Sequence, residues 1–277
     1  CAVVPAALAI AERQRASGEA LIRAVALGYD VSSRVAPAMG GIDARGWHGH
    51  ATHTIGPMFG AAAAALEAVR TPGEKVVLAR NLESLGLPDT SSESTWALRW
   101  ARTERVKNGP PEGELRWVEA SEEIDWRELH EWASRTAATD RIAEVLIVDD
   151  DLDVTTYRLS SCDPTGEISH ADNGEGDARP FPGLLEDVLA RGLLPRSGFK
   201  YGTRWRLYDP PLGVTHAPYL LQHEDEAPSD WAQVCLSARM ATGVNKTWLC
   251  GFEQAGEWRY LAVTRPPPDA RWANPRR

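Results

Sequence analysis

The pattern of hydrophobic and polar positions changes character once along the chain. In the N-terminal part, apolar residues recur at steps of three and four in residues 6–15 and 18–29, which is the period of an amphipathic helix. Ser17 directly precedes the second of these stretches and suits a helix N-cap. An alanine-rich stretch at 59–69 predicts a further helix, ended by Thr71-Pro72-Gly73. This part of the chain is therefore predicted to be all-helical.

From Glu74 onward the helical period gives way to short runs of β-forming residues. Runs of Val, Ile, Leu, Thr and aromatic residues that are bounded by Gly, Pro or Asp are typical of strands. The predicted strands lie at residues 144–148, 154–159, 205–208, 219–221, 247–249 and 258–263. Residues 162–182 are polar, rich in Gly and Asp and without periodicity, which predicts a linker.

The stretches on the two sides of this linker repeat one order of features. Each has Asp-Trp opening a helix or strand, at 125–126 and 230–231, and the starts of the copies are matched as Leu78–Gly86 with Leu184–Gly192. We therefore predict an α+β fold of two tandem modules, each a mixed sheet with flanking helices; two unrelated α+β stretches are the alternative. The predicted boundaries are 1–69 for the helical segment, 74–160 for the first module, 161–182 for the linker, 183–268 for the second module and 269–277 for a tail.

Composition narrows the class of protein less than these patterns do. The net charge of −9, from 30 basic and 39 acidic residues, counts against a polyanion-binding surface, although residues 191–206 hold five basic residues and no acid. The four cysteines form no CxxC pair and lack zinc-ligand spacing, so no metal site is indicated. We see neither a secretory signal nor a bilayer-length apolar run, and we expect a cytoplasmic protein without a membrane partner.

The second copy carries three side chains suited to proton transfer at a phosphate: Tyr208, His216 and Lys246. Histidine donates a proton well near neutral pH, tyrosine can accept one beside a cation, and lysine can stabilise extra negative charge on phosphorus. Together they suit attack of an RNA 2′-hydroxyl on its adjacent phosphate, which DNA cannot undergo. The first copy lacks the histidine and the lysine and has Trp100 or a neighbour in the tyrosine position, so we expect a scaffold without chemistry.

The sequence motifs around these residues are Arg191-Gly192, Gly198–Gly202, Tyr208, His216–Leu220, Arg239 and Gly243–Lys246. They resemble the two-repeat form of the archaeal tRNA-intron endonuclease family, over residues 74–268 and most clearly over 184–265. The resemblance implies a metal-independent RNA endonuclease (a tRNA-intron lyase) that uses no cofactor. It would cut precursor tRNA at bulge-helix-bulge junctions and leave 2′,3′-cyclic phosphate and 5′-hydroxyl ends. The resemblance makes Tyr208 the base, His216 the acid and Lys246 the charge stabiliser.

The same resemblance implies further contacts with RNA and with a second subunit. Arg239 would clamp a flipped-out base against an aromatic ring, either Tyr260 or Trp258; the alternative is that both aromatics are ordinary sheet residues. The two-repeat form implies a homodimer in which an acidic loop of the first module docks in a basic groove of the partner. By position, the acids of this loop are Asp149, Asp150, Asp151 and Asp153. A solvated hairpin turn is the alternative for that loop.

The N-terminal part resembles a different family. The matching words are Ala16–Leu21, Gly28-Tyr29, Arg45–His48 and Gly60–Ala65. Over residues 1–65 they resemble the 2-methylcitrate dehydratase and cis-aconitate decarboxylase (MmgE/PrpD) group, with His48 at an active-site position. A fragment of this length lacks the other catalytic parts of that family. Two further hypotheses stay open: a lyase fragment of this family, and a non-catalytic RNA-binding or assembly subunit.

Overall fold

The computed structural model describes residues 72–169 and 181–267, except 212 and 214, and the positions 8, 17–19, 21, 22, 62, 64–66 and 68–70. Contacts group Ala68–Ile147 with Thr155–Arg277 in one compact unit and Cys1–Glu67 with Val148–Val154 in another, and each unit is described by itself. In the second unit the Leu21 N–H donates to the Ser17 carbonyl over 3.0 Å, at the predicted helix start. Most of the predicted helical segment and the tail lie outside the described residues.

The described residues form an α+β fold, as the sequence predicts. The strands are β1 (Lys75–Leu78), β2 (Ala97–Trp100), β3 (Gly113–Glu119), β4 (Ile142–Val148), β5 (Val154–Cys162), β6 (Leu194–Ser197), β7 (Trp205–Tyr208), β8 (Tyr219–His223), β9 (Thr247–Gln254) and β10 (Glu257–Thr264). The α-helices are α4 (Trp126–Ala137), α5 (Pro182–Ala190) and α6 (Trp231–Gly243). Short 3₁₀ helices are η1 (Ala79–Asn81), η2 (Glu83–Leu85), η3 (Phe199–Tyr201) and η4 (Glu224–Glu226).

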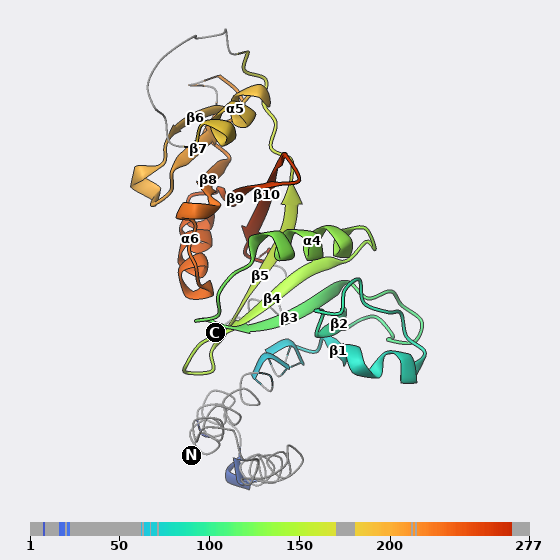
Figure 1. The fold of residues 1–277 in the computed structure, drawn as a ribbon. Helices are drawn as coiled ribbons and strands as arrows, with labels where there is room; N and C mark the ends of the chain where they lie inside the picture. The colour runs from blue at the N-terminus through green and yellow to red at the C-terminus, as the bar shows by residue number, and fades with distance from the viewer. Residues whose placement is uncertain are drawn as a thin grey trace, which may run out of the picture. The chain divides into compact units, whose positions relative to one another are not determined.

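The strands form one continuous sheet in the order β1-β2-β3-β4-β5-β10-β9-β8-β7-β6. The last strands of the two copies, β5 and β10, pair antiparallel at its centre, with Leu261 opposite Ser161 and Val263 opposite Leu159. Each copy therefore supplies one half of the sheet, and Figure 1 shows β1–β5 in cyan to yellow-green and β6–β10 in orange to red. The strand order is that expected of two like modules joined through their final strands.

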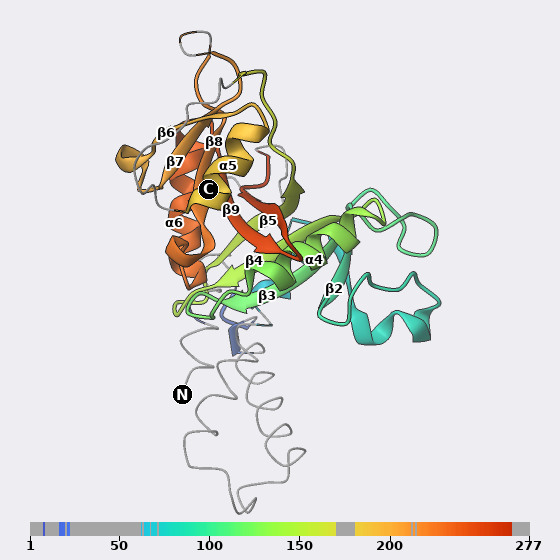
Figure 2. The same cartoon turned by 45° about the horizontal axis from the view of Figure 1, so that its top comes forward.

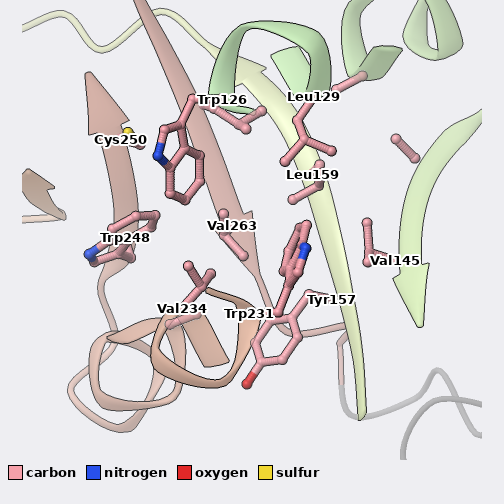
Figure 3. Packing of buried hydrophobic residues seen from close by; sticks show 14 of the residues in the cluster. Trp126, Leu129, Val145, Tyr157, Leu159, Trp231, Val234, Trp248, Cys250 and Val263 are labelled. Carbon is pink, nitrogen blue, oxygen red and sulfur yellow. The ribbon is translucent and has the colours of Figure 1, made fainter. Parts of the chain in front are cut away.

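Helices α4 and α6 pack on one face of this sheet and begin in the same way. Asp125 caps α4 and Asp230 caps α6, accepting hydrogen bonds from first-turn backbone N–H groups at 3.0 and 2.9 Å. The tryptophans that follow, Trp126 and Trp231, are buried in one hydrophobic cluster with residues of both copies, as Figure 3 shows. Trp126 lies 5.6 Å from Trp248, measured between ring centroids. The repeated Asp-Trp pair thus brings a helix from each copy onto a single shared core.

Helix α5 packs on the opposite face, where it covers the second copy only. Its residues Leu184 and Val188 are buried against apolar residues of β7, β9 and β10. Figure 2 shows α5 and α6 on opposite sides of the strands of this copy. Gly192 ends the helix with φ at 72°, a left-handed conformation that glycine adopts without strain.

The repeat predicted from the sequence is present in the backbone. The N–H of Ile142, which opens β4, donates to the Glu112 carbonyl, just as Thr247, which opens β9, donates to Pro218, both over 2.9 Å. The proposed match of Leu78–Gly86 with Leu184–Gly192 is wrong, however. Leu78 is the last residue of β1, whereas Leu184–Ala190 is helical. The sequence match failed because Leu-Ala-Arg is common in both a strand end and a helix end.

The counterpart of α5 lies further toward the N-terminus than the sequence suggested. Helical residues 68–70 precede Gly73, whose φ is 101°, in the way that α5 precedes Gly192. The start of the predicted linker, residues 161–182, is more structured than the sequence suggested. β5 extends through Cys162, and residues 166–168 form backbone hydrogen bonds with the second copy. The Gly166 N–H donates to Arg191 over 2.9 Å, and a Cβ on Gly166 would lie 2.4 Å from the Gly192 carbonyl oxygen.

The two halves of the sheet differ on the face that α5 covers. In the second copy Leu193, Leu207, Leu249 and Ala262 form part of one apolar cluster there. The corresponding residues of the first copy are charged, namely Glu74, Arg99, Glu144 and Arg158. Strand register aligns Glu74, Arg99 and Glu144 with Leu193, Leu207 and Leu249. Arg158 is matched with Ala262 because it contacts Glu144 from the next strand, as Ala262 pairs with Leu249.

These charges form a buried ion cluster. Arg99 is 1% exposed, and its Nε and Nη1 atoms lie 2.7 Å from Glu144 and 3.0 Å from Glu74. Arg158 lies 3.1 Å from Glu144, which is fully buried. Burial would lower the pKa of Arg99, but Glu144 and Glu112 raise it further than burial lowers it. The first copy therefore holds paired charges where the second holds an apolar core.

Candidate active site

Strand register brings the three predicted catalytic residues to one edge of the sheet. β8 and β9 are parallel and start together, with Tyr219 opposite Thr247. His216 precedes the first of these strands and Lys246 precedes the second. β7 runs antiparallel to β8, with Leu207 opposite Tyr219, so it ends with Tyr208 at that same edge. The fold thus places at one edge the last residue of β7 and the residues that precede β8 and β9.

Lys246 is held close to His216. Its Nζ donates a hydrogen bond to the carbonyl oxygen of Ala217, the residue next to His216. The Lys246 backbone N–H donates to Ala241 of α6 over 2.9 Å, and Asn245 before it turns the chain with a left-handed φ of 54°. His216 is exposed and Lys246 is half-buried. Neither side chain is therefore closed off from solvent.

Tyr208 is half-buried at the end of β7 beside a cation of its own strand. The Arg206 guanidinium carbon lies 5.6 Å from the centroid of the Tyr208 ring. Among the described residues, Arg206 Nε and Asp209 Oδ1 are buried polar atoms without a hydrogen-bond partner. Arg206 is one of the five basic residues in the stretch 191–206, but no role at the site was predicted for it. Its alternation with Tyr208 along a strand places both on one face and was the available signal.

The corresponding edge of the first copy carries different chemistry. By strand register, Trp100 occupies the position of Tyr208 and Arg141 that of Lys246. The Trp100 indole donates to the Gly109 carbonyl over 2.9 Å, and Arg141 forms a 2.8 Å ion pair with the fully buried Glu114. The indole and guanidinium groups are thus committed to contacts within the protein.

Arg239 lies on the exposed side of α6, and the structure adds a second arginine to it. Arg239 and Arg265 both act electrostatically on the hydroxyl of Tyr157: burial raises the pKa of this hydroxyl to about 12 even though the two arginines act to lower it. Arg265 follows β10, which ends beside the start of β9 because Val263 pairs with Trp248. Both arginines are exposed near the edge that holds Lys246. A basic residue directly after the last predicted strand was the signal for Arg265.

The two aromatic residues predicted to stack on a base lie elsewhere. Tyr260 is 1% exposed, packs in the cluster under α5 and donates its hydroxyl to Asp187. Burial, followed by Asp187, raises the pKa of this hydroxyl. Trp258 is half-buried near the start of β10, with its ring centroid 5.7 Å from that of His223. A buried ring offers no face to a base, so the contact predicted for Tyr260 does not fit this fold.

The acidic loop belongs to the other compact unit and is ordered by its first residue. Asp149 Oδ1 accepts hydrogen bonds from the backbone N–H groups of Asp151 and Asp153, at 3.1 and 2.8 Å. Leu152 adopts a left-handed φ of 61°. Asp150, Asp151 and Asp153 are exposed. One carboxylate therefore shapes the turn, and the other three are presented to solvent.

Within the described part of the chain, no cluster of His, Cys, Asp and Glu has the arrangement of a metal site. The described helices likewise include none of the length and apolar character needed to span a membrane. The basic side chains at or near the candidate site are those of Arg206, Arg239, Lys246 and Arg265.

Comparison with known proteins gives a likeness for the part of the α+β fold that carries this edge. Residues 186–260 match the family model of the tRNA intron endonuclease, catalytic C-terminal domain. The chain is 30% identical over 82 residues to a tRNA-splicing endonuclease of Thermoplasma volcanium, covering 30% of this chain and 27% of that protein. It is 32% identical over 63 residues to a tRNA-splicing endonuclease of Picrophilus torridus, covering 23% and 21%. The resemblance noted in the sequence is confirmed.

The matched part spans about a quarter of the length of these curated relatives. The N-terminal resemblance is also confirmed, because residues 1–104 match the MmgE/PrpD N-terminal domain. That match extends beyond residue 65 and includes Lys75–Leu78 and Ala97–Trp100, which form β1 and β2 of the sheet described above. The MmgE/PrpD match therefore ends within the first copy, whereas the endonuclease match lies within the second copy.

Proposed function

We propose that this chain is an endonuclease that removes introns from precursor tRNA by cutting bulge-helix-bulge junctions. The observation that carries the proposal is the meeting of Tyr208, His216 and Lys246 at one sheet edge, within the stretch that matches the tRNA intron endonuclease catalytic domain. Similarity to two tRNA-splicing endonucleases supports it. Each residue has an ordinary structural role when taken singly, so the argument rests on their joint position.

The proposed reaction is attack by the ribose 2′-oxygen on the adjacent phosphorus. Tyr208, as its phenolate, accepts the 2′-hydroxyl proton and becomes the neutral phenol as the bond from O2′ to phosphorus forms. The bond from phosphorus to O5′ then breaks, and His216 donates the proton that the leaving oxygen takes up. Lys246 stabilises the additional negative charge on the phosphoryl oxygens. The products are a 2′,3′-cyclic phosphate and a 5′-hydroxyl, and no metal ion or cofactor takes part.

Arg239 and Arg265 are proposed to hold the base next to the scissile phosphate. Both are exposed beside the edge that carries Lys246, and a planar guanidinium stacks on a base face of any sequence. This replaces the pairing of Arg239 with Tyr260. Trp258 stands near the opposite end of β10 from Arg265. The net charge of −9 disfavours RNA binding, but the two arginines give the site a local positive charge that attracts the phosphate backbone.

The proposed assembly is a homodimer in which the acidic loop docks against basic residues of a second molecule. The ordered turn at Asp149, with three further carboxylates presented to solvent, supports this proposal. Replacing Asp150 and Asp151 by lysine leaves the Asp149 side-chain hydrogen bonds in place and reverses the charge. We expect that variant to sediment as a monomer where the wild type sediments as a dimer; an unchanged dimer would exclude the loop from the interface.

The test of function uses an end-labelled bulge-helix-bulge RNA in the presence of EDTA. We expect cleavage at both bulges with cyclic-phosphate ends, and no cleavage where the attacking nucleotide carries a single 2′-deoxy substitution. His216→Ala should lose most activity while keeping its unfolding transition. Arg135→Ala, an exposed arginine on α4 of the first copy, serves as the matched control. Cleavage by His216→Ala at the wild-type rate would exclude the proposed acid, and binding without cleavage would favour a non-catalytic subunit.

A further inference from the structure

The most specific contact near the site that the proposed mechanism does not use is between Lys246 and an aromatic ring. We propose that Tyr201 is a positioning residue for Lys246: its ring face and the Ala217 carbonyl oxygen together hold the ammonium group beside His216. The catalytic consequence rests on the proposed function, whereas the contact itself can be measured without RNA.

Tyr201 is placed by a turn with little conformational freedom. A Cβ on Gly198 would lie 2.4 Å from Thr203 Oγ1, and Gly202 has a left-handed φ of 68°, so both glycines are required by the backbone. Phe199, at the tip, is 89% exposed. Tyr201 is half-buried and packs against the core shared by α4 and α6. The turn thus directs one aromatic ring to solvent and the other inward.

The inward ring meets the catalytic lysine. Lys246 Nζ lies 5.9 Å from the centroid of the Tyr201 ring and donates to the Ala217 carbonyl. A cation over an aromatic face gains about 0.5–1 kcal/mol at exposed sites and about 2 kcal/mol when desolvated. Lys200 Nζ lies 5.1 Å from the same ring, but its side chain is exposed. The two contacts on Lys246 restrict a flexible side chain to the side of His216.

The first copy provides an internal comparison. Tyr201 lies four residues after the end of β6, and Leu82 lies four residues after the end of β1, so the two residues occupy equivalent positions. Leu82 packs in an apolar cluster with Leu98 and Trp100. In this copy the position of Lys246 is taken by Arg141, which pairs with a carboxylate. The ring and the lysine therefore occur together in one copy and are both replaced in the other.

The test exploits the chain's four lysines, Lys75, Lys107, Lys200 and Lys246. Brief acetylation of the full chain with acetic anhydride, followed by mass spectrometry, gives a rate for each lysine. We expect Tyr201→Leu to raise the labelling rate of Lys246 about threefold relative to Lys107, the size of a surface cation–π contact. Tyr201→Phe keeps the ring face and should restore the protection. Phe199→Leu removes the solvent-facing ring of the same turn and is the matched control.

The outcomes separate this inference from the proposed function. Equal Lys246 labelling in wild type and Tyr201→Leu, at unchanged thermal stability, would overturn the inference even if the protein cleaves RNA. If the protein cleaves, Tyr201→Leu should lower kcat about threefold to tenfold with KM nearly unchanged, and the loss should vanish in a Lys246→Ala background. Additive losses in that double variant would show that Tyr201 does not act through Lys246. Absence of wild-type cleavage would overturn the proposed function and leave the labelling result valid.

Discussion

The ion cluster of the first copy predicts an unusual response to mutation. Glu144 is fully buried between Arg99, at 2.7 Å, and Arg158, at 3.1 Å. Glu144→Leu would leave the guanidinium of Arg99, itself 1% exposed, without its principal partner. Removing one member of a buried ion pair costs about 3–5 kcal/mol, because the remaining charge stays desolvated. For a protein of this size, such a loss lowers Tm by roughly 6–20 °C.

The second copy shows which residues fill the same space without charge. Replacing Glu74, Arg99 and Glu144 by Leu and Arg158 by Ala copies Leu193, Leu207, Leu249 and Ala262 and leaves the net charge unchanged. An apolar replacement of a buried ion cluster is often neutral or stabilising by about 1–4 kcal/mol. We therefore expect the fourfold variant to recover most of the stability that the single variant loses.

The assay is urea unfolding followed by fluorescence, for which the chain's 11 tryptophans provide a signal. Wild type, Glu144→Leu and the fourfold variant are compared at equal protein concentration, with the slope m reported beside the free energy of unfolding. Arg135→Ala, which breaks an exposed pair at 3.5 Å, is the control and should change stability by less than about 0.5 kcal/mol. A single variant within about 1 kcal/mol of wild type, or a fourfold variant as unstable as the single one, would refute this account of the cluster.

Three further predictions concern chemistry and pH. Lys246→Ala should reduce RNA cleavage by at least about a hundredfold with the unfolding transition kept, and a variant that cuts at the wild-type rate would exclude its role. Burial, followed by Arg259, lowers the pKa of His130, so its contribution to stability holds above the unfolded-state value of about 6.5 and is lost as pH falls below it. His130→Gln should therefore flatten the loss of unfolding free energy between pH 7 and pH 5, and an equal slope in both proteins would contradict this. Burial raises the pKa of Cys235 to about 11, so its thiol should react with a disulfide reagent at pH 8 far more slowly than in urea; equal rates would show that it is not shielded.

Much of the second copy could be predicted from local signals. The alternation of apolar residues placed strands at 205–208, 219–221, 247–249 and 258–263, and each lies within an observed strand. The Asp-Trp pairs, predicted to open either a helix or a strand, stand at the starts of α4 and α6, where each Asp caps the first turn of its own helix. The clear error was the alignment of the two copies at Leu78, where similar short segments belong to a strand in one copy and to a helix in the other. Strand pairing was needed to align the copies, because a short segment of sequence does not specify its pairing partner.

The sequence by itself determined the residue types at the candidate site and the fold class. Tyr208, His216 and Lys246 could be named because their chemistry and their surrounding words are local properties of the chain. Only the tertiary structure decided what lies beside them. Side-chain burial removed Tyr260 from the candidate site, the fold placed Arg239 and Arg265 within electrostatic reach of the same Tyr157 hydroxyl, and the turn at Gly198–Gly202 set the Tyr201 ring against Lys246. The reason is physical: burial and proximity across a sheet depend on pairings between distant strands, which the periodicity of one strand does not specify.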